Sequence, residues 1–214
     1  KQRSYCNGRL WRKLDYRLIM AITINGNGTV TGISVGGLPD GIVDADTLAG
    51  GSAGPLLNYK TTLYTAVDTA LSGSSGTWQA GPFSVTITPN SSSSKILVMC
   101  HVTGGNSGGY GEGPVFQIQR KIGSGSFAAV GIGDAQGSSS RGTVGGLFDK
   151  LTTSETITFG AQFIDAPSTT SAVEYKPYFV VENGNLLINR AGTDNSSERI
   201  VGTSAITVIE VGAG

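Results

Sequence analysis

The sequence predicts an all-β fold: an antiparallel β-sandwich, jelly-roll-like, in the C-terminal part of the chain, with an extended N-terminal arm and a short N-terminal helix before it. Three observations predict this. Glycine supplies 33 of the 214 residues, about twice the usual share, which favours turns over helices. Short apolar segments recur between turn residues from about residue 58 onward, as in sandwich proteins. Helical periodicity occurs in one segment only, near the N-terminus.

The short helix is predicted at residues 10–18. Leu10, Trp11, Leu14 and Leu18 are spaced so that they share one face of a helix. Residues 1–20 hold six basic side chains and one acidic one, which leaves 9 basic and 14 acidic residues in the rest of the chain. Such a helix is suited to anchoring on an acidic partner, nucleic acid or a membrane surface. Two alternatives remain open: an ordinary surface helix, and an extension upstream of a protein that starts at Met20.

The arm is predicted to reach residue 57, so that the domains are 1–57 and 58–214. Its apolar residues alternate with polar ones over short stretches, and glycine and proline interrupt them repeatedly. A segment of this kind cannot bury a core of its own, so we expect it to gain order on another chain or on a symmetry mate. The expected anchoring residues are Leu10, Trp11, Leu14, Leu18, Ile22 and Ile24.

Strands are predicted throughout the second domain. They are expected at 85–88, 95–102, 114–121, 127–132, 142–148, 157–163, 173–181, 186–190 and 204–211. The segment 95–102 is apolar at nearly every position, so we expect it to be buried on both faces. Gly123-Ser124-Gly125 predicts a hairpin turn. Pro177 lies within a strand pattern and predicts an edge strand or a bulge.

Composition excludes several functions. Basic and acidic residues balance at 15 each and charged residues are only 14% of the chain, which argues against a nucleic-acid binder and against charge-driven disorder. No apolar run is long enough for membrane insertion, and the patch at 18–22 is too short for a signal core. His101, Cys6 and Cys100 are the only histidine and cysteines, so neither a metal site nor a cofactor is expected. Cys100 is expected as a buried small hydrophobe, and assembly in a reducing cytoplasm is favoured.

Two segments resemble the motifs that carry a nucleophilic serine. Residues 50–54 fit G-x-S-x-G but lack the strand-to-helix context, and residues 105–109 (GNSGG) would need a histidine oriented by a carboxylate. No catalytic residue is therefore predicted. The enzyme alternative is a glycan depolymerase, which would need two of the available carboxylates in one groove. The candidates are Glu112, Asp134, Asp149, Glu155 and Asp165.

A glycine-rich loop is predicted at residues 101–114, with Asn106, Tyr110 and Glu112 as its exposed side chains. Glycine-rich loops that carry Asn and Tyr make adaptable recognition surfaces, because Tyr offers contact area at low entropic cost. A glycan stacked on Tyr110 and hydrogen-bonded to Asn106 and Glu112 would suit this loop. The alternative is a loop without a partner.

The sequence also resembles a known group of proteins. Residues 20–49 (MAITINGNGTVTGISVGGLPDGIVDADTLA) are similar to the start of tail-fibre and related virion proteins of tailed bacteriophages, of the aquatic phage type. SSKILV at 93–98, GIGDA at 131–135, DAPSTT at 165–170, INR at 188–190 and SAITVIE at 204–210 resemble segments of their C-terminal β-domain. The resemblance spans residues 20–211. The basic helix before Met20 and the lack of a long repetitive shaft depart from it.

This resemblance implies a non-enzymatic structural virion protein, assembled in the host cytoplasm as a homotrimer. Residues 1–57 would attach it to tail, baseplate or capsid proteins, and the sandwich would contact a host-surface glycan or protein. A head-fibre or a capsid decoration (cement) protein is the alternative, because a chain without the shaft fits either. Neither nucleic acid nor membrane insertion is part of this expectation.

Overall fold

A computed structural model describes residues 23–24, 30–31, 56–67, 71–72, 77–107, 114–145, 153–181, 184–193 and 200–212. The chain divides into two compact units, Lys1–Ser52 and Ala53–Gly214. In the first unit, β1 (Thr23–Ile24) pairs antiparallel with β2 (Val30–Thr31). The helix predicted at 10–18 lies outside the described residues.

The second unit consists of strands and connecting turns, and its described residues contain no helix. The strands are β3 (Leu56–Tyr64), β4 (Leu71–Ser72), β5 (Gln79–Ala80), β6 (Val85–Ile87), β7 (Lys95–Asn106), β8 (Val115–Ile122), β9 (Ala128–Val130), β10 (Val144–Gly145), β11 (Thr156–Asp165), β12 (Val173–Val180), β13 (Asn185–Ile188) and β14 (Ser204–Val211). Among the described residues, no helix is long and apolar enough to span a membrane.

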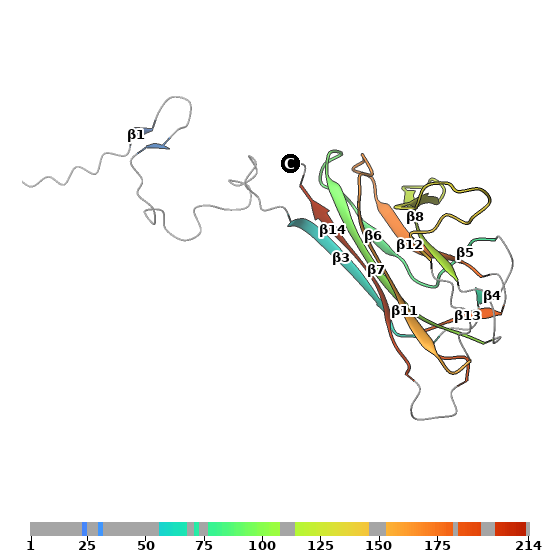
Figure 1. The fold of residues 1–214 in the computed structure, drawn as a ribbon. Coiled ribbons are helices and arrows are strands. Elements are labelled where there is room, and N and C mark those ends of the chain that lie inside the picture. The colour runs from blue at the N-terminus through green and yellow to red at the C-terminus, as the bar shows by residue number, and fades with distance from the viewer. Residues whose placement is uncertain are drawn as a thin grey trace, which may run out of the picture. The chain divides into compact units, whose positions relative to one another are not determined.

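The strands pair in a nested order. β3 pairs with β14, β6 with β12, β7 with β11 and β8 with β9, all antiparallel. In the second unit the first strand, β3, thus pairs with the last, β14, and the strands between them pair in the same nested way toward the middle of the sequence. The arrangement is that of one long hairpin rolled into two sheets. This is the jelly-roll arrangement, so the predicted antiparallel, jelly-roll-like β-sandwich is confirmed (Figure 1).

Each sheet has four main positions. The first sheet has the order β3–β14–β7–β11, with β13 beside the far end of β7 and β4 next to β13. In the second sheet β12 and β8 are central. The short strands β6 and β5 share the outer edge of β12, and β9 and β10 share that of β8. Figure 1 shows β3, β14, β7 and β11 side by side in one layer.

The core lies between the two sheets and is apolar. Alternate residues of β7, β12 and β14 point inward and are buried. Cys100 is one of them, as predicted, and burial raises the pKa of its thiol from 9.0 to about 12. The largest side chains that are almost fully buried are Tyr175, Phe116, Phe179, Ile87, Ile96, Ile118, Ile188 and Ile206.

Glu210 closes one end of the sandwich. It is fully buried on β14 and accepts three hydrogen bonds. The backbone N–H of Asn90 donates to Oε1 at 2.7 Å, Asn90 Nδ2 donates to Oε2 at 3.0 Å, and Asn58 Nδ2 donates to Oε2 at 3.3 Å. These bonds attach the β6–β7 turn and β3 to the last strand of the chain, so the carboxylate is a structural group.

Asn189, just after β13, is the corresponding group in a second buried network. Its φ of 65° is in the left-handed region that Asn tolerates better than most residues. Its Nδ2 donates to the carbonyl oxygens of Tyr64 and Ala66, both at 2.9 Å, and its Oδ1 accepts from Ser204 Oγ at 2.7 Å. Since the side-chain amide is fully used, this network fixes β3, β13 and β14 relative to one another.

An ion pair joins the two sheets. Arg120 Nη1 on β8 donates to both oxygens of Asp165 on β11, at 2.7 and 2.8 Å. The hydroxyl of Tyr175 on β12 donates to Asp165 Oδ2 at 2.6 Å. Burial, and then the hydrogen bond to Asp165, raise the pKa of Tyr175 above its ordinary value.

Several strand predictions differ from the structure. The short strands β4 and β5 were not predicted, and β10 spans only Val144–Gly145 of the segment predicted at 142–148. β7 continues to Asn106, four residues beyond its predicted end, because residues 104–106 pair with β13 and residues 103–105 with β11. Glycine is required at position 105 since the backbone of Arg190 and Ala191 leaves no room for a side chain. β3 was not predicted, since its inward side carries Asn58 and Thr62 instead of an apolar series. β12 is central, not an edge strand.

Pro177 is tolerated in the central strand because its two neighbours on one side are short. β6 pairs with residues 173–175 and β5 with 178–179, so Pro177 lies at the gap between them. Its carbonyl accepts from Gly81 N at 2.8 Å, and a strand residue directs its nitrogen to the same side as its carbonyl. The missing N–H therefore interrupts no ladder pair.

Candidate interaction surface

The outer face of the first sheet is the most distinctive surface of the described structure. In the middle of this sheet, three outward-facing residues from each of four strands align in three rows. We call these twelve residues the open face. The rows are Tyr59–Ile209–Leu97–Ile164, Thr61–Thr207–Met99–Gln162 and Leu63–Ala205–His101–Gly160, each in the order β3, β14, β7, β11. The next outward position of β7, beyond the first of these rows, is the exposed Lys95, opposite Val211.

The open face is apolar at one end and contains no Asp, Glu, Lys or Arg. Tyr59, Leu63 and Ile164 are 64%, 61% and 55% exposed. The other large hydrophobic residues that the described structure leaves exposed are Val67, Ile200 and Val201, in the segments that follow β3 and precede β14. Exposed apolar side chains scattered singly are ordinary, but a contiguous group of them marks an interaction site.

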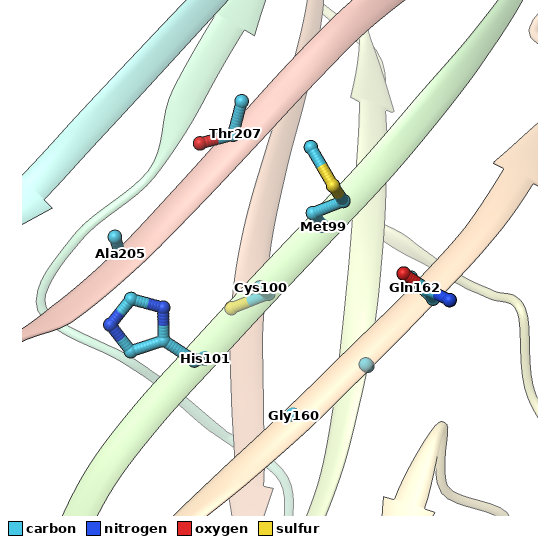
Figure 2. A pocket seen from close by; sticks show the side chains of 8 residues that line it. Met99, Cys100, His101, Gly160, Gln162, Ala205 and Thr207 are labelled. Atoms are coloured by element: carbon cyan, nitrogen blue, oxygen red, sulfur yellow. The ribbon is translucent and has the colours of Figure 1, made fainter.

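A depression lies within the open face. It has a volume of about 590 Å³, and β7, β11 and β14 line it with Met99, Cys100, His101, Gly160, Ala161, Gln162, Ala205 and Thr207. Figure 2 shows His101 between Ala205 and Gly160, on neighbouring strands. The small residues create the hollow: a Cβ atom added to Gly160 would meet no atom within 4 Å.

The outer face of the second sheet is different, because its polar groups are paired. Lys121 Nζ lies 2.5 Å from Glu174 Oε2 and 4.9 Å from the centre of the Phe127 ring. The hydrogen bond from Lys121 holds the pKa of Glu174 below its usual value. Phe127 in turn packs against Tyr178, with ring centroids 5.5 Å apart. This face is that of an ordinary solvated sheet.

The strand β7 explains why the open face is unusual. Its sequence predicted burial on both faces, yet the structure buries only one: Leu97 and Met99 are half-buried and His101 is exposed. The prediction of a strand without a wet face is thus wrong for the single chain. Apolar side chains on the face of β7 that the single chain leaves uncovered indicate a surface suited to contact with another protein.

The predicted recognition residues fall in different places. Asn106 is the last residue of β7, half-buried and paired with Leu186 of β13, so it belongs to the sheet. Tyr110 and Glu112 lie outside the described residues. Of the predicted anchoring residues, Ile24 lies in β1 opposite Val30, and Leu10, Trp11, Leu14, Leu18 and Ile22 lie outside the described residues.

The structure does not bring the serine-motif groups together. Ser107 follows β7, and its Oγ accepts from Asn185 Nδ2 at 3.0 Å. His101 is six residues earlier, which is about 20 Å along an extended strand. A nucleophile and its base must be within hydrogen-bonding reach, so the two do not form such a pair.

The carboxylates of the enzyme alternative are also dispersed. Asp165 is held in the ion pair with Arg120, whereas Asp134 and Glu155 are exposed. Glu112 and Asp149 lie outside the described residues. Within the part of the chain that the structure describes, no three His, Cys, Asp or Glu side chains cluster as metal ligands would. The open face, which sequence reasoning did not find, is therefore the candidate site; the apolar outward positions of segment 95–102 were its signal.

Comparison with known proteins gives little. No protein-family model matches the chain, and neither does a curated protein. Solved structures of infectious bursal disease virus, Gt and Gx strains, match with 13% and 10% identity and TM-scores of 0.36 and 0.33. The VP2 subviral particle of that virus matches with 11% identity and a TM-score of 0.31.

These matches cover 73% of this chain but only 42%, 40% and 41% of the viral chains. The chain thus spans less than half the length of the structures that it matches. TM-scores this low do not establish a shared fold, and it is the strand pairing that defines the jelly roll here.

Proposed function

We propose that this protein is a structural virion component of the tail-fibre type, which acts by assembly and attachment and not by catalysis. The observation that carries the proposal is the open face: twelve adjoining outward residues without Asp, Glu, Lys or Arg, three of them large apolar side chains that are more than half exposed. Such a surface gains free energy when another protein covers it.

Two sequence features support the virion role. The resemblance of residues 20–49 and of several later segments to tail-fibre proteins points to a phage particle. The arm, interrupted by glycine and proline, is suited to lying along a partner. In the proposal residues 1–57 attach the protein to tail, baseplate or capsid proteins, and the sandwich projects as a homotrimer.

Host attachment is the second part of the proposal. Multivalent display on one particle converts weak single-site contacts into firm adhesion. Asn106 ends β7 beside Leu186, and Tyr110 and Glu112 follow it in the sequence by four and six residues. We propose that these three residues contact a host-surface glycan or protein.

Electron microscopy of particles that contain the protein tests this function. The protein would carry a small antibody-recognised tag after Gly214, and labelled particles would be imaged. Label at the tail or baseplate, in groups of three, is the expected result. Label spread over the capsid would make the protein a decoration protein and remove the attachment role. Label absent from purified particles would contradict the virion role altogether.

An assay for sugar release tests the non-catalytic part. Purified protein incubated with host-surface polysaccharide should release no reducing ends above the level seen with heat-denatured protein. Turnover that an Asp134→Asn substitution abolished would assign a depolymerase instead.

A further inference from the structure

We infer that the open face is an interface between copies of this chain, in which Leu63 on β3 of one copy packs into the depression beside Gly160 of the next. The inference deepens the proposed function and rests on it for one point, that several copies assemble. It specifies which surface they use and which side chains meet.

The first argument concerns charge. None of the twelve residues is Asp, Glu, Lys or Arg. Two copies of a charged surface repel each other, whereas two copies of these twelve residues meet without repulsion, with Lys95 beyond the first row left at the rim. A strongly acidic or basic partner, or nucleic acid, would find no complementary charge there, so a second copy fits this face better than such partners do.

The second argument concerns shape. The face holds both a projection, on its edge strand β3, and a hollow, which the other three strands line. Leu63, 61% exposed, projects from β3, and the depression of about 590 Å³ lies between β14, β7 and β11. A surface that contains its own complement can pack against a copy of itself.

The third argument is symmetry. Projection and hollow are different patches, so a contact that joins one to the other is heterologous, and repeating it closes a ring when the rotation allows. Three copies with their open faces toward a common axis would each insert Leu63 into the next. The same two patches would also meet in a face-to-face pair, which would place β3 of each copy against β11 of the other.

The size of the face sets the expected strength. Four strands about 4.8 Å apart and five residues of about 3.4 Å each cover on the order of 300 Å² per copy. A stable interface buries about 800 Å² per partner. Association through this face alone should therefore be weak and concentration-dependent, and a covalent trap is the suitable measurement.

A disulfide trap tests the contact. Leu63→Cys and Gly160→Cys are combined in full-length protein that also carries Cys6→Ser. Within one copy these positions are separated by three strand spacings, Leu63 to Ala205 to His101 to Gly160, or about 14 Å. Since a disulfide needs Cα atoms within about 7 Å, this pair can bond only between copies.

The control places the second cysteine on the other sheet. Leu63→Cys with Thr86→Cys has the same number of exposed thiols, because Thr86 is exposed on β6. After mild oxidation, the open-face pair should give dimers or closed trimers on a non-reducing gel, at least tenfold more than the control pair, and reductant should remove them.

Equal cross-linking of the two pairs, or none, would overturn the inference. The Gly160 position has free space for the new side chain; circular dichroism of each variant shows whether it folds. If a variant does not fold, sedimentation of the unmodified protein at rising concentration decides: a monomer at every concentration overturns the inference.

The disulfide trap and the electron microscopy of particles test different claims, so one can fail while the other holds. Open-face cross-links in a protein that is absent from phage particles would uphold the interface and reject the virion role. Labelled particles together with an absence of open-face cross-links would uphold the virion role and reject the interface. Closed trimers would in addition support the proposed homotrimer, and a dimer alone would contradict it.

Discussion

Glu210 is the residue on which the end of the sandwich depends. It is fully buried, and its carboxylate accepts three hydrogen bonds from Asn58 and Asn90. Glu210→Ala would remove the hydrogen bonds from the half-buried Asn58 and the exposed Asn90 and would leave a cavity at a fully buried position. Hydrogen bonds to a charged group contribute about 1.5–3 kcal/mol each. We expect a loss of about 3 kcal/mol or more in the free energy of unfolding, measured by urea denaturation.

The exposed Asp134 supplies the matched control. Asp134→Ala also removes one carboxylate, but from a solvent-exposed position, so its effect should stay within about 0.5 kcal/mol. Glu210→Gln keeps the side-chain volume but replaces one acceptor oxygen by a donor NH2 group. Its free energy of unfolding should lie between those of Glu210→Ala and Asp134→Ala. Equal stability of Glu210→Ala and Asp134→Ala would show that the three bonds contribute nothing.

Tyr175 makes the free energy of unfolding decrease at alkaline pH. Its pKa is raised by burial and by the hydrogen bond to Asp165, so the folded protein keeps a proton that the unfolded chain releases above about pH 10. The stabilisation is complete below that pH and is lost as the pH rises further. Burial of Cys100 acts with the same sign between pH 9 and about 12.

Tyr175→Phe separates the tyrosine contribution. At pH 7 the variant should lose about 1 kcal/mol, the value of one buried hydrogen bond. Above pH 10 its stability should fall less steeply than that of the unmodified protein, as urea unfolding at pH 7, 9 and 10.5 would show. Parallel pH curves for the two proteins would contradict this assignment.

Residue-level networks of this kind could not be predicted from the sequence. Glu210, Asn90 and Asn58 are far apart in the chain: the register of β14 against β3 pairs Glu210 with Asn58, and the turn between β6 and β7 brings Asn90 to them. Burial of Cys100, in contrast, could be predicted, because its neighbours along the strand are themselves apolar.

At the scale of elements, two glycines on neighbouring strands have opposite roles. A Cβ atom on Gly105 of β7 would lie 2.5 Å from the carbonyl oxygen of Arg190 and 2.9 Å from Ala191 Cα, which are backbone atoms. Gly160 of β11 has open space. Gly105→Ala should therefore cost about 2 kcal/mol or more, as overpacking does, and displace Arg190 and Ala191, which follow β13.

Gly160→Ala is the control for that substitution, with the same chemical change on the neighbouring strand. Removing the backbone freedom of glycine should stabilise it by up to about 1 kcal/mol. Thermal unfolding measured at low protein concentration compares the two variants. A lower melting temperature for Gly160→Ala than for Gly105→Ala would show that the close contacts with Arg190 and Ala191 are not what requires glycine.

The same scale shows where strand prediction from sequence succeeds and fails. Segment 204–211 was predicted with its observed bounds, because apolar residues alternate along it and face a core. β3 was missed since Tyr59 and Leu63 point away from the core, and the end of β7 was missed because paired glycines imitate a loop. The first failure concerns the open face, whose apolar residues point away from the core. The second concerns residues that the chain's own later segments cover, which the local sequence does not reveal.

For the whole molecule, an interface between copies makes thermal stability depend on concentration. Association stabilises the folded state by mass action, so the melting temperature should rise with protein concentration. Leu63→Glu adds a charge to the open face; burying it against a second copy would leave it without a partner. Because Leu63 is largely exposed in the single chain, the variant should keep its melting temperature at low concentration and lose the concentration dependence.

Gln119→Glu provides the matched charge on the opposite sheet. Gln119 lies opposite Lys176 in the β8–β12 ladder, so the new carboxylate gains a neighbour of opposite charge and disturbs no pairing. This variant should melt like the unmodified protein at every concentration. If Leu63→Glu and Gln119→Glu shift the curve equally, net charge and not the open face governs association, and the uncovered apolar rows would then need another occupant.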